Sequence, residues 1–189
     1  MIRIAVLGKI GSGKTYIANN FGYPVFNADY EVSKLYKYDK KTFIQLNKKL
    51  PKYIFKFPID KKKIVKAILV NKNNLKKINE IVHKKIRIKM KLFLKKNINK
   101  KIVILDIPLL LENKINNKKD VLIFVDSKEQ EIHKRLKKRK DFNSKLVNIF
   151  RNIQLSPIYK KKNSKFIIKN NFNKKSVKKD ISVILKKIL

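Results

Sequence analysis

The feature that most restricts the fold is an eight-residue loop near the N-terminus, residues 8–15, which reads GKIGSGKT. It follows a short apolar run and matches the pattern G-x-x-x-x-G-K-[ST], the phosphate-binding P-loop. Gly11 and Gly13 permit backbone angles that side chains exclude, so that successive N–H groups can converge on a phosphate. Lys14 is expected to place its ammonium group on the terminal phosphates of a nucleotide. The Thr15 hydroxyl is placed to ligate Mg²⁺.

Glycine is scarce in the rest of the chain. There are only four glycines among 189 residues, and Gly8, Gly11 and Gly13 all fall in this loop. A glycine-rich turn that binds nothing is the alternative, and the concentration of glycine in one loop weighs against it. The sequence therefore predicts a nucleotide-phosphate site.

The net charge of +37 suggests a nucleic-acid-binding protein when it is taken alone. The lysines, however, are scattered as pairs along the whole chain and form no basic stripe or arm. Lysine, asparagine and isoleucine, all abundant here, have codons rich in A and T. We therefore attribute most of the charge to compositional drift, expect no specific nucleic-acid partner, and keep a nucleic-acid surface as the alternative.

Three further absences bear on where the protein works. The chain has no cysteine, which fits a reducing compartment. Its first residues lead straight into a predicted strand, so no signal peptide is expected. No uncharged apolar stretch approaches the length of a membrane span. We expect a soluble, cytoplasmic protein, a monomer, that does not associate with membranes.

Apolar runs alternate with helical patterns, which is typical of an α/β fold with a parallel sheet of about five strands flanked by helices. A helix is expected from Thr15 to about Phe21, with Gly22 as its C-cap. Further helices are expected at residues 142–154 and 176–189. The predicted strands are residues 3–7, 23–27, 101–106, 120–125 and 165–169.

Two acids follow predicted strands, at the sheet edge where ligands bind in such folds. Asp29 could accept a proton from an attacking hydroxyl, or it could cap a helix that begins near Tyr30. Asp106 could hold Mg²⁺ or a water bound to it, or it could cap the next turn. Position alone leaves both pairs of alternatives open.

Residues 31–99 carry apolar side chains at helical spacing and predict a helical insertion of a size suited to substrate binding. His83 lies at the border of an apolar helix face, where a lone histidine is more often structural than functional. Residues 127–130 predict a helix that begins with a capping box at Ser127. That helix would carry Arg135 and Arg139 on one face, where they could bind phosphate or only be solvated. Only five of the 50 basic residues are arginine, which favours a phosphate-binding role.

Several motifs in this order resemble the dephospho-coenzyme A kinase family of P-loop kinases, and the resemblance extends over essentially the whole length. Asn27-Ala28-Asp29 stands for the family's Asp-Ala-Asp, and residues 108–112 match its Pro-Leu-Leu-x-Glu. The remaining matches are Ile78-Asn79 with His83, the pair Arg135 and Arg139, Gln154, and Ile168-Lys169-Asn170.

The resemblance implies transfer of the γ-phosphoryl group of ATP to the ribose 3′-hydroxyl of dephospho-CoA, with Mg²⁺ as cofactor. It implies a P-loop kinase core at residues 1–30, 100–126 and 157–189, a coenzyme-A-binding insertion at 31–99 and a lid at 127–156. The implied catalytic residues are Asp29 as base, Lys14 and Arg139. The implied ATP-binding residues are Gly11, Ser12, Gly13, Lys14, Thr15, Tyr16, Arg135, Arg139 and Asn170. The implied acceptor-binding residues are Asp29, Asn79, His83, Pro108 and Leu109, and the implied metal ligands are Thr15 and Asp106.

Some positions depart from the family pattern. Lys9 and Phe172 stand where the family prefers glycine, and Asn27 replaces the first acid of Asp-Ala-Asp. Tyr16, Lys84 and the pair at residues 164–165 are further departures. Two other functions stay open: a different P-loop kinase that acts on nucleosides or nucleoside monophosphates, and a nucleic-acid-dependent ATPase.

Overall fold

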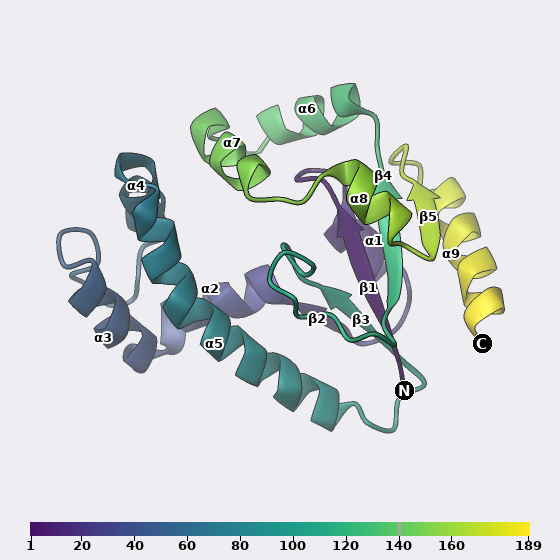
Figure 1. Ribbon diagram of the computed structural model, residues 1–189, viewed down its shortest axis with the longest axis horizontal. Helices are drawn as coiled ribbons and strands as arrows, with labels where there is room; N and C mark the ends of the chain where they lie inside the picture. Colours follow the sequence, from purple (N-terminus) through teal and green to yellow (C-terminus); the bar gives the residue numbers. More distant parts are fainter. Residues whose placement is uncertain (140) are drawn as a thin grey trace. The chain divides into compact units, whose positions relative to one another are not determined.

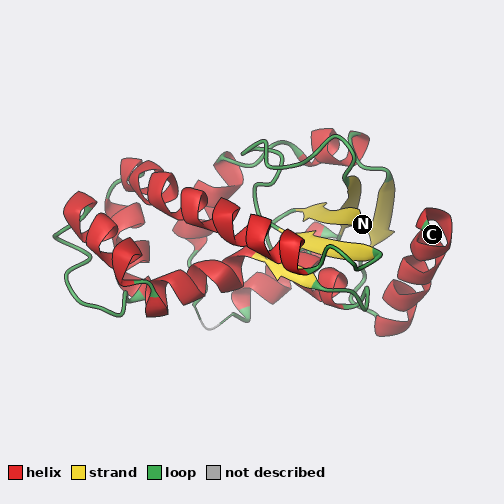
Figure 2. Cartoon of the chain, turned by 90° about the horizontal axis from the view of Figure 1, so that it is seen from below, coloured by secondary structure: helices red, strands yellow, loops and turns green. Residues whose placement is uncertain are grey.

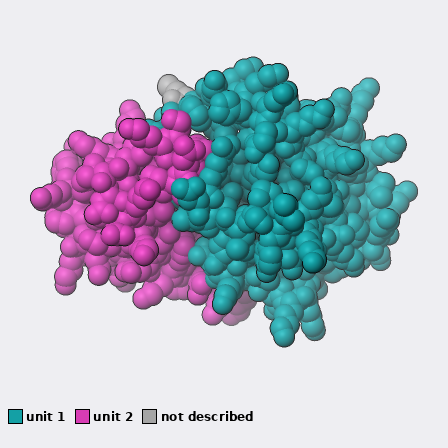
Figure 3. Space-filling model, turned by 45° about the horizontal axis from the view of Figure 1, so that its top comes forward, with its two compact units in different colours: residues 1–27, 97–143, 150–189 teal, residues 28–96, 144–149 magenta. Residues whose placement is uncertain are grey.

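The computed structural model describes residues 1–139 and 141–189, which divide into two compact units (Figure 3). Unit 1 contains residues 1–27, 97–143 and 150–189. Unit 2 contains residues 28–96 and 144–149. The chain therefore passes from one unit to the other several times, and a long insertion separates the first two strands of unit 1 from the rest.

Unit 1 is built on a five-stranded parallel sheet in the order β2-β3-β1-β4-β5 (Figures 1 and 2). This confirms the predicted α/β class and its parallel sheet. The strands are β1 Ile2–Gly8, β2 Val25–Asn27, β3 Ile102–Asp106, β4 Val121–Asp126 and β5 Phe166–Lys169.

The central strand of the sheet, β1, is a buried apolar run. β1 pairs with β3 on one side and with β4 on the other, with Ile4 opposite Ile104 and Val121. Residues 4–7 are buried, as expected for a strand that is covered on both faces. Alternate side chains such as Ile4 and Val6 pack in one cluster with residues of the helices α1 Lys14–Asn19 and α9 Lys174–Ile188.

Helix α1 is shorter than predicted. It ends at Asn19 with Asn20 as its C-cap, so the expectation of a helix to Phe21 capped by Gly22 was wrong. The Asn20 side chain donates to the carbonyl oxygen of Tyr16 at 2.8 Å, which takes an acceptor that a longer helix would use. Gly22 instead lies in the following turn, with φ 74°.

Helix α6, Glu129–Lys137, also differs at both ends. The capping box at Ser127 was wrong, because the N-cap is Lys128 and the Ser127 hydroxyl donates to the Ser12 carbonyl oxygen at 2.9 Å. Arg139 lies beyond the C-cap Lys138, so it does not share a helix face with Arg135 as predicted.

The predicted helix at residues 142–154 is α7, Ser144–Asn152. A further helix that was not predicted, α8 Pro157–Lys162, follows it. Ser156 caps α8 by accepting from the N–H of Tyr159, and Pro157 occupies its first position. Helix α8 is short, and its apolar side chains Ile158 and Tyr159 are exposed. It therefore has no buried apolar face that a sequence pattern could have indicated.

Unit 2 is helical, as predicted for the insertion. Its helices are α2 Ala28–Tyr38, α3 Lys40–Lys49, α4 Lys61–Val70 and α5 Asn73–Lys96, together with residues 144–149 of α7. Helix α2 begins directly after β2, so Asp29 lies inside its first turn, and the alternative that Asp29 caps this helix is excluded. No helix in the described ranges is long and apolar enough to cross a membrane.

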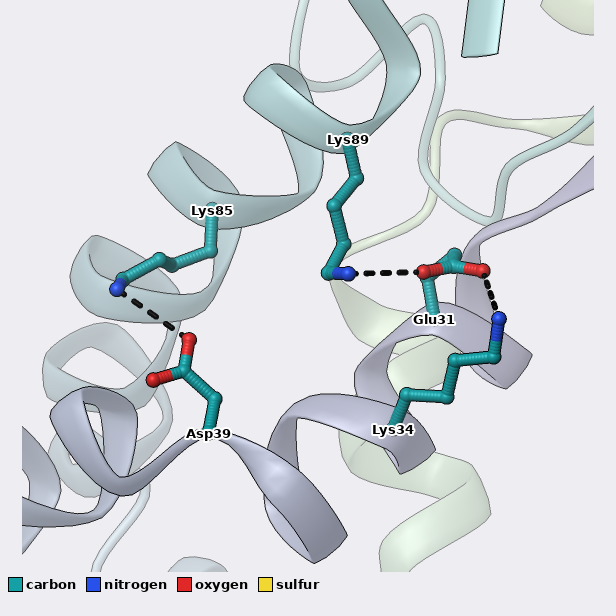
Figure 4. Close-up of polar contacts among 5 residues, drawn as sticks. All are labelled: Glu31, Lys34, Asp39, Lys85 and Lys89. Atoms are coloured by element: carbon teal, nitrogen blue, oxygen red, sulfur yellow. Dashed lines mark hydrogen bonds and ion pairs between the residues drawn. The ribbon is translucent and has the colours of Figure 1, made fainter. Parts of the chain in front are cut away.

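Ion pairs join helices within unit 2 (Figure 4). Glu31 contacts Lys34 at 3.0 Å and Lys89 at 3.3 Å, and Asp39 contacts Lys85 at 3.3 Å. Partial burial alone would raise the pKa of Glu31, but hydrogen bonds from both lysines outweigh it and lower the pKa. The pKa of Asp39 is lowered in the same way, because hydrogen bonds from Thr42 and Lys85 outweigh burial.

Candidate active site

The loop between β1 and α1 has the backbone that the P-loop pattern demands. Gly11 has φ 84° and Gly13 has φ 89°, values that L side chains rarely adopt. A Cβ atom on Gly11 would lie 2.9 Å from Leu136 of α6, and one on Gly13 would lie 2.4 Å from the Asn170 amide nitrogen. Glycine is therefore required at both positions, because of the positive φ angle and because a Cβ atom would be too close to its neighbours.

Two side chains brace this loop from distant parts of unit 1. The carbonyl oxygen of Ser12 accepts from the Ser127 hydroxyl at 2.9 Å and from the Asn170 amide at 2.8 Å. All three residues are buried. The Ser12 hydroxyl is also buried, and it has no hydrogen-bond partner among residues 1–139 and 141–189. Ser127 was missed as a site residue because its partner lies 115 positions away.

The two lysines of the loop differ in direction. Lys14 Nζ donates to the carbonyl oxygens of Gly8 and Lys9, at 3.2 and 2.9 Å, and so stays within the loop. Lys9 Nζ contacts Glu129 in the first turn of α6 at 2.9 Å. Lys9, which departs from the family's glycine, thus links the loop to helix α6. The charge of Lys14 stays at the loop itself.

A carboxylate and a hydroxyl meet at the ends of α1 and β3. The Thr15 hydroxyl donates to Asp106 Oδ2 at 2.6 Å, and the Asn27 amide donates to the same oxygen at 2.7 Å. Asp106 is only 3% exposed. Asn27 therefore holds Asp106 of the neighbouring strand by a hydrogen bond. Sequence reasoning missed this role because it treated Asn27 only as the loss of the family's first acid.

The oxygen atoms of Thr15 and Asp106 are the type that Mg²⁺ prefers. No cluster of three or more acids or histidines that could hold a metal occurs in the described part of the chain. A Mg²⁺ ion bound with a nucleotide does not require one, because it takes one or two protein ligands together with phosphate oxygens and waters. The residues present therefore fit this ion.

Arg135 and Phe172 stack near the loop. The guanidinium carbon of Arg135 lies 4.1 Å from the ring centre of Phe172, whose φ is 62°. The Phe172 ring would meet a Cβ placed on Gly13 at 3.1 Å. The phenylalanine that replaces a family glycine thus keeps the left-handed backbone. Arg139 is exposed in the turn after α6, and the Tyr16 ring packs against the apolar core.

The segment after β3 holds two more predicted residues, Pro108 and Leu109. Both are half-buried, and Leu109 has φ 60°, an unusual value for leucine. Its neighbour Leu110 is 1% exposed. Such a backbone persists only where the surroundings determine it, and it occurs most often at functional sites.

Unit 2 carries the other three predicted residues. Asp29 is exposed in the first turn of α2. Asn79 and His83 are half-buried on α5, four residues apart and therefore on one helix face. Burial lowers the pKa of His83, and the nearby charge of Arg87 lowers it further, so the neutral ring is favoured at neutral pH.

A parallel sheet with a P-loop after its central strand, and an acid at the end of the adjacent strand, defines the class of P-loop nucleotide-binding proteins. A structure from Thermus thermophilus, TT1252, matches the fold with a TM-score of 0.78 and 21% identity, over 100% of this chain and 98% of that one. Dephospho-CoA kinase from Campylobacter jejuni matches with a TM-score of 0.65 and 21% identity, over 98% and 96%.

Within that class, the family model for dephospho-CoA kinase matches residues 2–176. A dephospho-CoA kinase of Wolbachia pipientis wMel is 34% identical over 179 residues, which cover 92% of this chain and 91% of the relative. The chain belongs to the dephospho-CoA kinase family.

Proposed function

We propose that the chain transfers the γ-phosphoryl group of ATP to the ribose 3′-hydroxyl of dephospho-CoA, giving coenzyme A and ADP. The family match over residues 2–176 carries this proposal. The P-loop and the contact between Thr15 and Asp106 supply the phosphate and metal chemistry that the reaction needs.

In the proposed step, the 3′-oxygen forms a bond to the γ-phosphorus while the bond from that phosphorus to the bridging oxygen of ADP breaks. Asp29 takes the hydroxyl proton, which makes the oxygen a better nucleophile. Asp29 suits this role because its carboxylate lies at the first turn of α2, where the chain leaves the strand end.

The phosphates would be held by the loop, with Gly11, Ser12, Gly13, Thr15 and Tyr16 contributing backbone N–H groups. Lys14, Arg135 and Arg139 would neutralise charge on the transferring group. Asn170, buried against Gly13, would lie beside the adenine. Thr15 and Asp106 would hold Mg²⁺, which supplies positive charge to the phosphate oxygens when bound.

We assign the acceptor to Asn79, His83, Pro108 and Leu109. In this assignment residues 31–99 bind coenzyme A, residues 127–156 form a lid, and the remaining segments bind the nucleotide. A neutral His83 can donate or accept a hydrogen bond, as a polar acceptor molecule requires. We further propose that the enzyme acts as a monomer in the cytoplasm.

The test measures ADP formation with ATP and Mg²⁺, first with dephospho-CoA and then with adenosine, AMP or single-stranded RNA in its place. We expect turnover with dephospho-CoA alone. Turnover only with adenosine or AMP would favour another P-loop kinase, and stimulation by RNA would favour an ATPase that acts on nucleic acid.

The role of Asp29 is tested in the same assay. Asp29→Asn should lower kcat by about a hundredfold or more, because the amide cannot take the proton. Glu31→Gln, which changes another acid of the same helical turn, is the matched control and should keep kcat within about threefold. Equal rates for Asp29→Asn and wild type would leave the reaction intact and remove Asp29 as the base.

A further inference from the structure

Lys160 is unlike every other lysine in the ranges 1–139 and 141–189, because it alone is buried. The chain has 50 basic residues, of which five are arginine and 45 are lysine. Lys160 is 4% exposed, whereas its apolar neighbours Ile158 and Tyr159 are 79% and 51% exposed. Helix α8 thus turns a charged side chain inward and two apolar ones outward, which reverses the usual order.

The buried ammonium group has one acid as its partner. Lys160 Nζ lies 2.7 Å from Glu112 Oε1, and the two side chains are 5% and 10% exposed. The backbone N–H of Leu155 donates to the same oxygen at 2.9 Å. Since a buried ion pair is costly to desolvate, its presence here suggests a use other than stability.

Glu112 closes the segment that carries the strained Leu109. The N–H of Asn113 bonds to the Leu109 carbonyl oxygen at 3.0 Å, and the N–H of Ile115 bonds to that of Leu110 at 3.0 Å. The buried Leu110 and the paired Glu112 therefore fix the backbone on the C-terminal side of Leu109. These contacts surround the left-handed backbone of Leu109, a conformation that persists only where the surroundings determine it.

We propose that Glu112 and Lys160 are positioning residues that hold Pro108 and Leu109 in the conformation that receives dephospho-CoA. This inference rests on the proposed function, and it adds Lys160 to the residues that determine acceptor binding. The pair acts through the backbone of residues 107–115 and does not touch the reacting atoms. Its loss should therefore weaken acceptor binding and spare ATP binding.

The experiment compares Lys160→Met with Lys161→Met, a change of the same type at the next position. Lys161 is exposed and pairs with Asp126 at 2.9 Å. Lys160→Met should raise KM for dephospho-CoA by about tenfold, while the Kd for ATP measured without acceptor stays within about threefold. Lys161→Met should change neither. Lys160→Arg, which keeps the charge, should recover part of the loss.

Hydrogen exchange supplies a readout that does not depend on activity. In Lys160→Met the amides of Asn113 and Ile115 should exchange faster, while amides of β1 and β4 stay protected. A rise in KM without faster exchange at these amides would contradict positioning through this segment. An equal loss of ATP binding would mean a general structural role and would also overturn the proposal.

Lys160→Met leaves the buried Glu112 without its partner, which could unfold the protein. A double variant that removes both charges avoids this problem. Glu112→Leu with Lys160→Met replaces the whole pair by apolar side chains, which buried sites often tolerate. A folded double variant with the wild-type KM would overturn the inference and leave the proposed function standing. Absence of product from the wild-type enzyme with dephospho-CoA would instead reject the proposed function, and the inference with it.

Discussion

The two units use polar contacts in different ways. In unit 1 the contacts around the P-loop are long-range, such as Thr15 with Asp106 across 91 positions and Asn170 with Ser12 across 158. In unit 2 the ion pairs of Figure 4 lie between partly exposed side chains, and two of them, Asp39–Lys85 and Glu31–Lys89, link α5 to residues outside it. Because a buried polar group that loses its partner is costly and an exposed one is not, changes in the two units should have very different effects.

The largest difference should come from Asp106. Asp106→Asn keeps the shape of the side chain but removes the charge that Thr15 and Asn27 hydrogen-bond to. We expect kcat to fall by about a hundredfold or more, because the proposed Mg²⁺ site would lose its charged ligand. Kinetics at increasing Mg²⁺ concentrations should show that the variant needs more Mg²⁺ to reach half of its maximal rate.

The matched change is Asp126→Asn, at the end of strand β4, which lies on the other side of β1 from β3. Asp126 pairs only through an exposed contact with Lys161 among the ion pairs of the described residues. Its replacement should leave kcat within about threefold. Equal losses in both variants would show that the position of Asp106 carries no special role.

A second test separates backbone strain from space at the P-loop. Gly13→Ala combines a φ of 89° with a Cβ only 2.4 Å from the Asn170 amide nitrogen. We expect ATP affinity to fall by roughly tenfold or more, because Asn170 must move away from Ser12. Calorimetric titration with ATP measures this effect.

Gly22 provides the control for that test. It has φ 74°, and a Cβ there would meet nothing within 4 Å. Gly22→Ala therefore introduces the strain alone, which should cost about 1–2 kcal/mol of stability and leave ATP affinity unchanged. If both alanine variants lost ATP affinity alike, backbone strain would account for the effect and the contact with Asn170 would not.

The smallest effect should come from Lys85→Met in unit 2. Removing the partner of Asp39 should lower the free energy of unfolding by about 1 kcal/mol or less at neutral pH, because the pair is partly exposed. The pKa of Asp39 is lowered in the folded protein, so its contribution is present above the unfolded pKa and is lost as pH falls through the folded pKa.

The difference between Lys85→Met and wild type should therefore be present at about pH 7 and be smaller at an acidic pH below the ordinary pKa of aspartate. Urea unfolding at both pH values measures it, and about 1 M NaCl should shrink it at neutral pH. A difference that persisted in acid and in high salt would indicate that Lys85 stabilises α5 through its methylene groups.

The sequence predicted those parts of unit 1 whose signal is local. The loop of residues 8–15 and the apolar strands are readable from spacing alone, and each lies where it was expected within a few residues. The helical nature of the insertion was readable for the same reason. Such features depend on neighbours in the chain.

Features that depend on distant partners were missed. Ser127 has the sequence context of a helix cap, yet its hydroxyl bonds to Ser12. In the sequence Lys160 cannot be distinguished from the surface lysines. Its burial depends on the ion pair with Glu112, which lies 48 positions earlier. Arg139 was placed on a helix face because nothing near it marks the end of α6 at Lys137.

The order of strands has a consequence for synthesis. β1 is made before its sheet neighbours β3 and β4, which begin at Ile102 and Val121, and Asn170, which donates to Ser12, is made later still. The growing chain therefore carries its nucleotide-binding loop long before it carries the groups that brace that loop. We therefore expect ATP to contribute little to the early stages of folding, and a chain cut short before β5 would hold the motif without the hydrogen bond from Asn170 to Ser12.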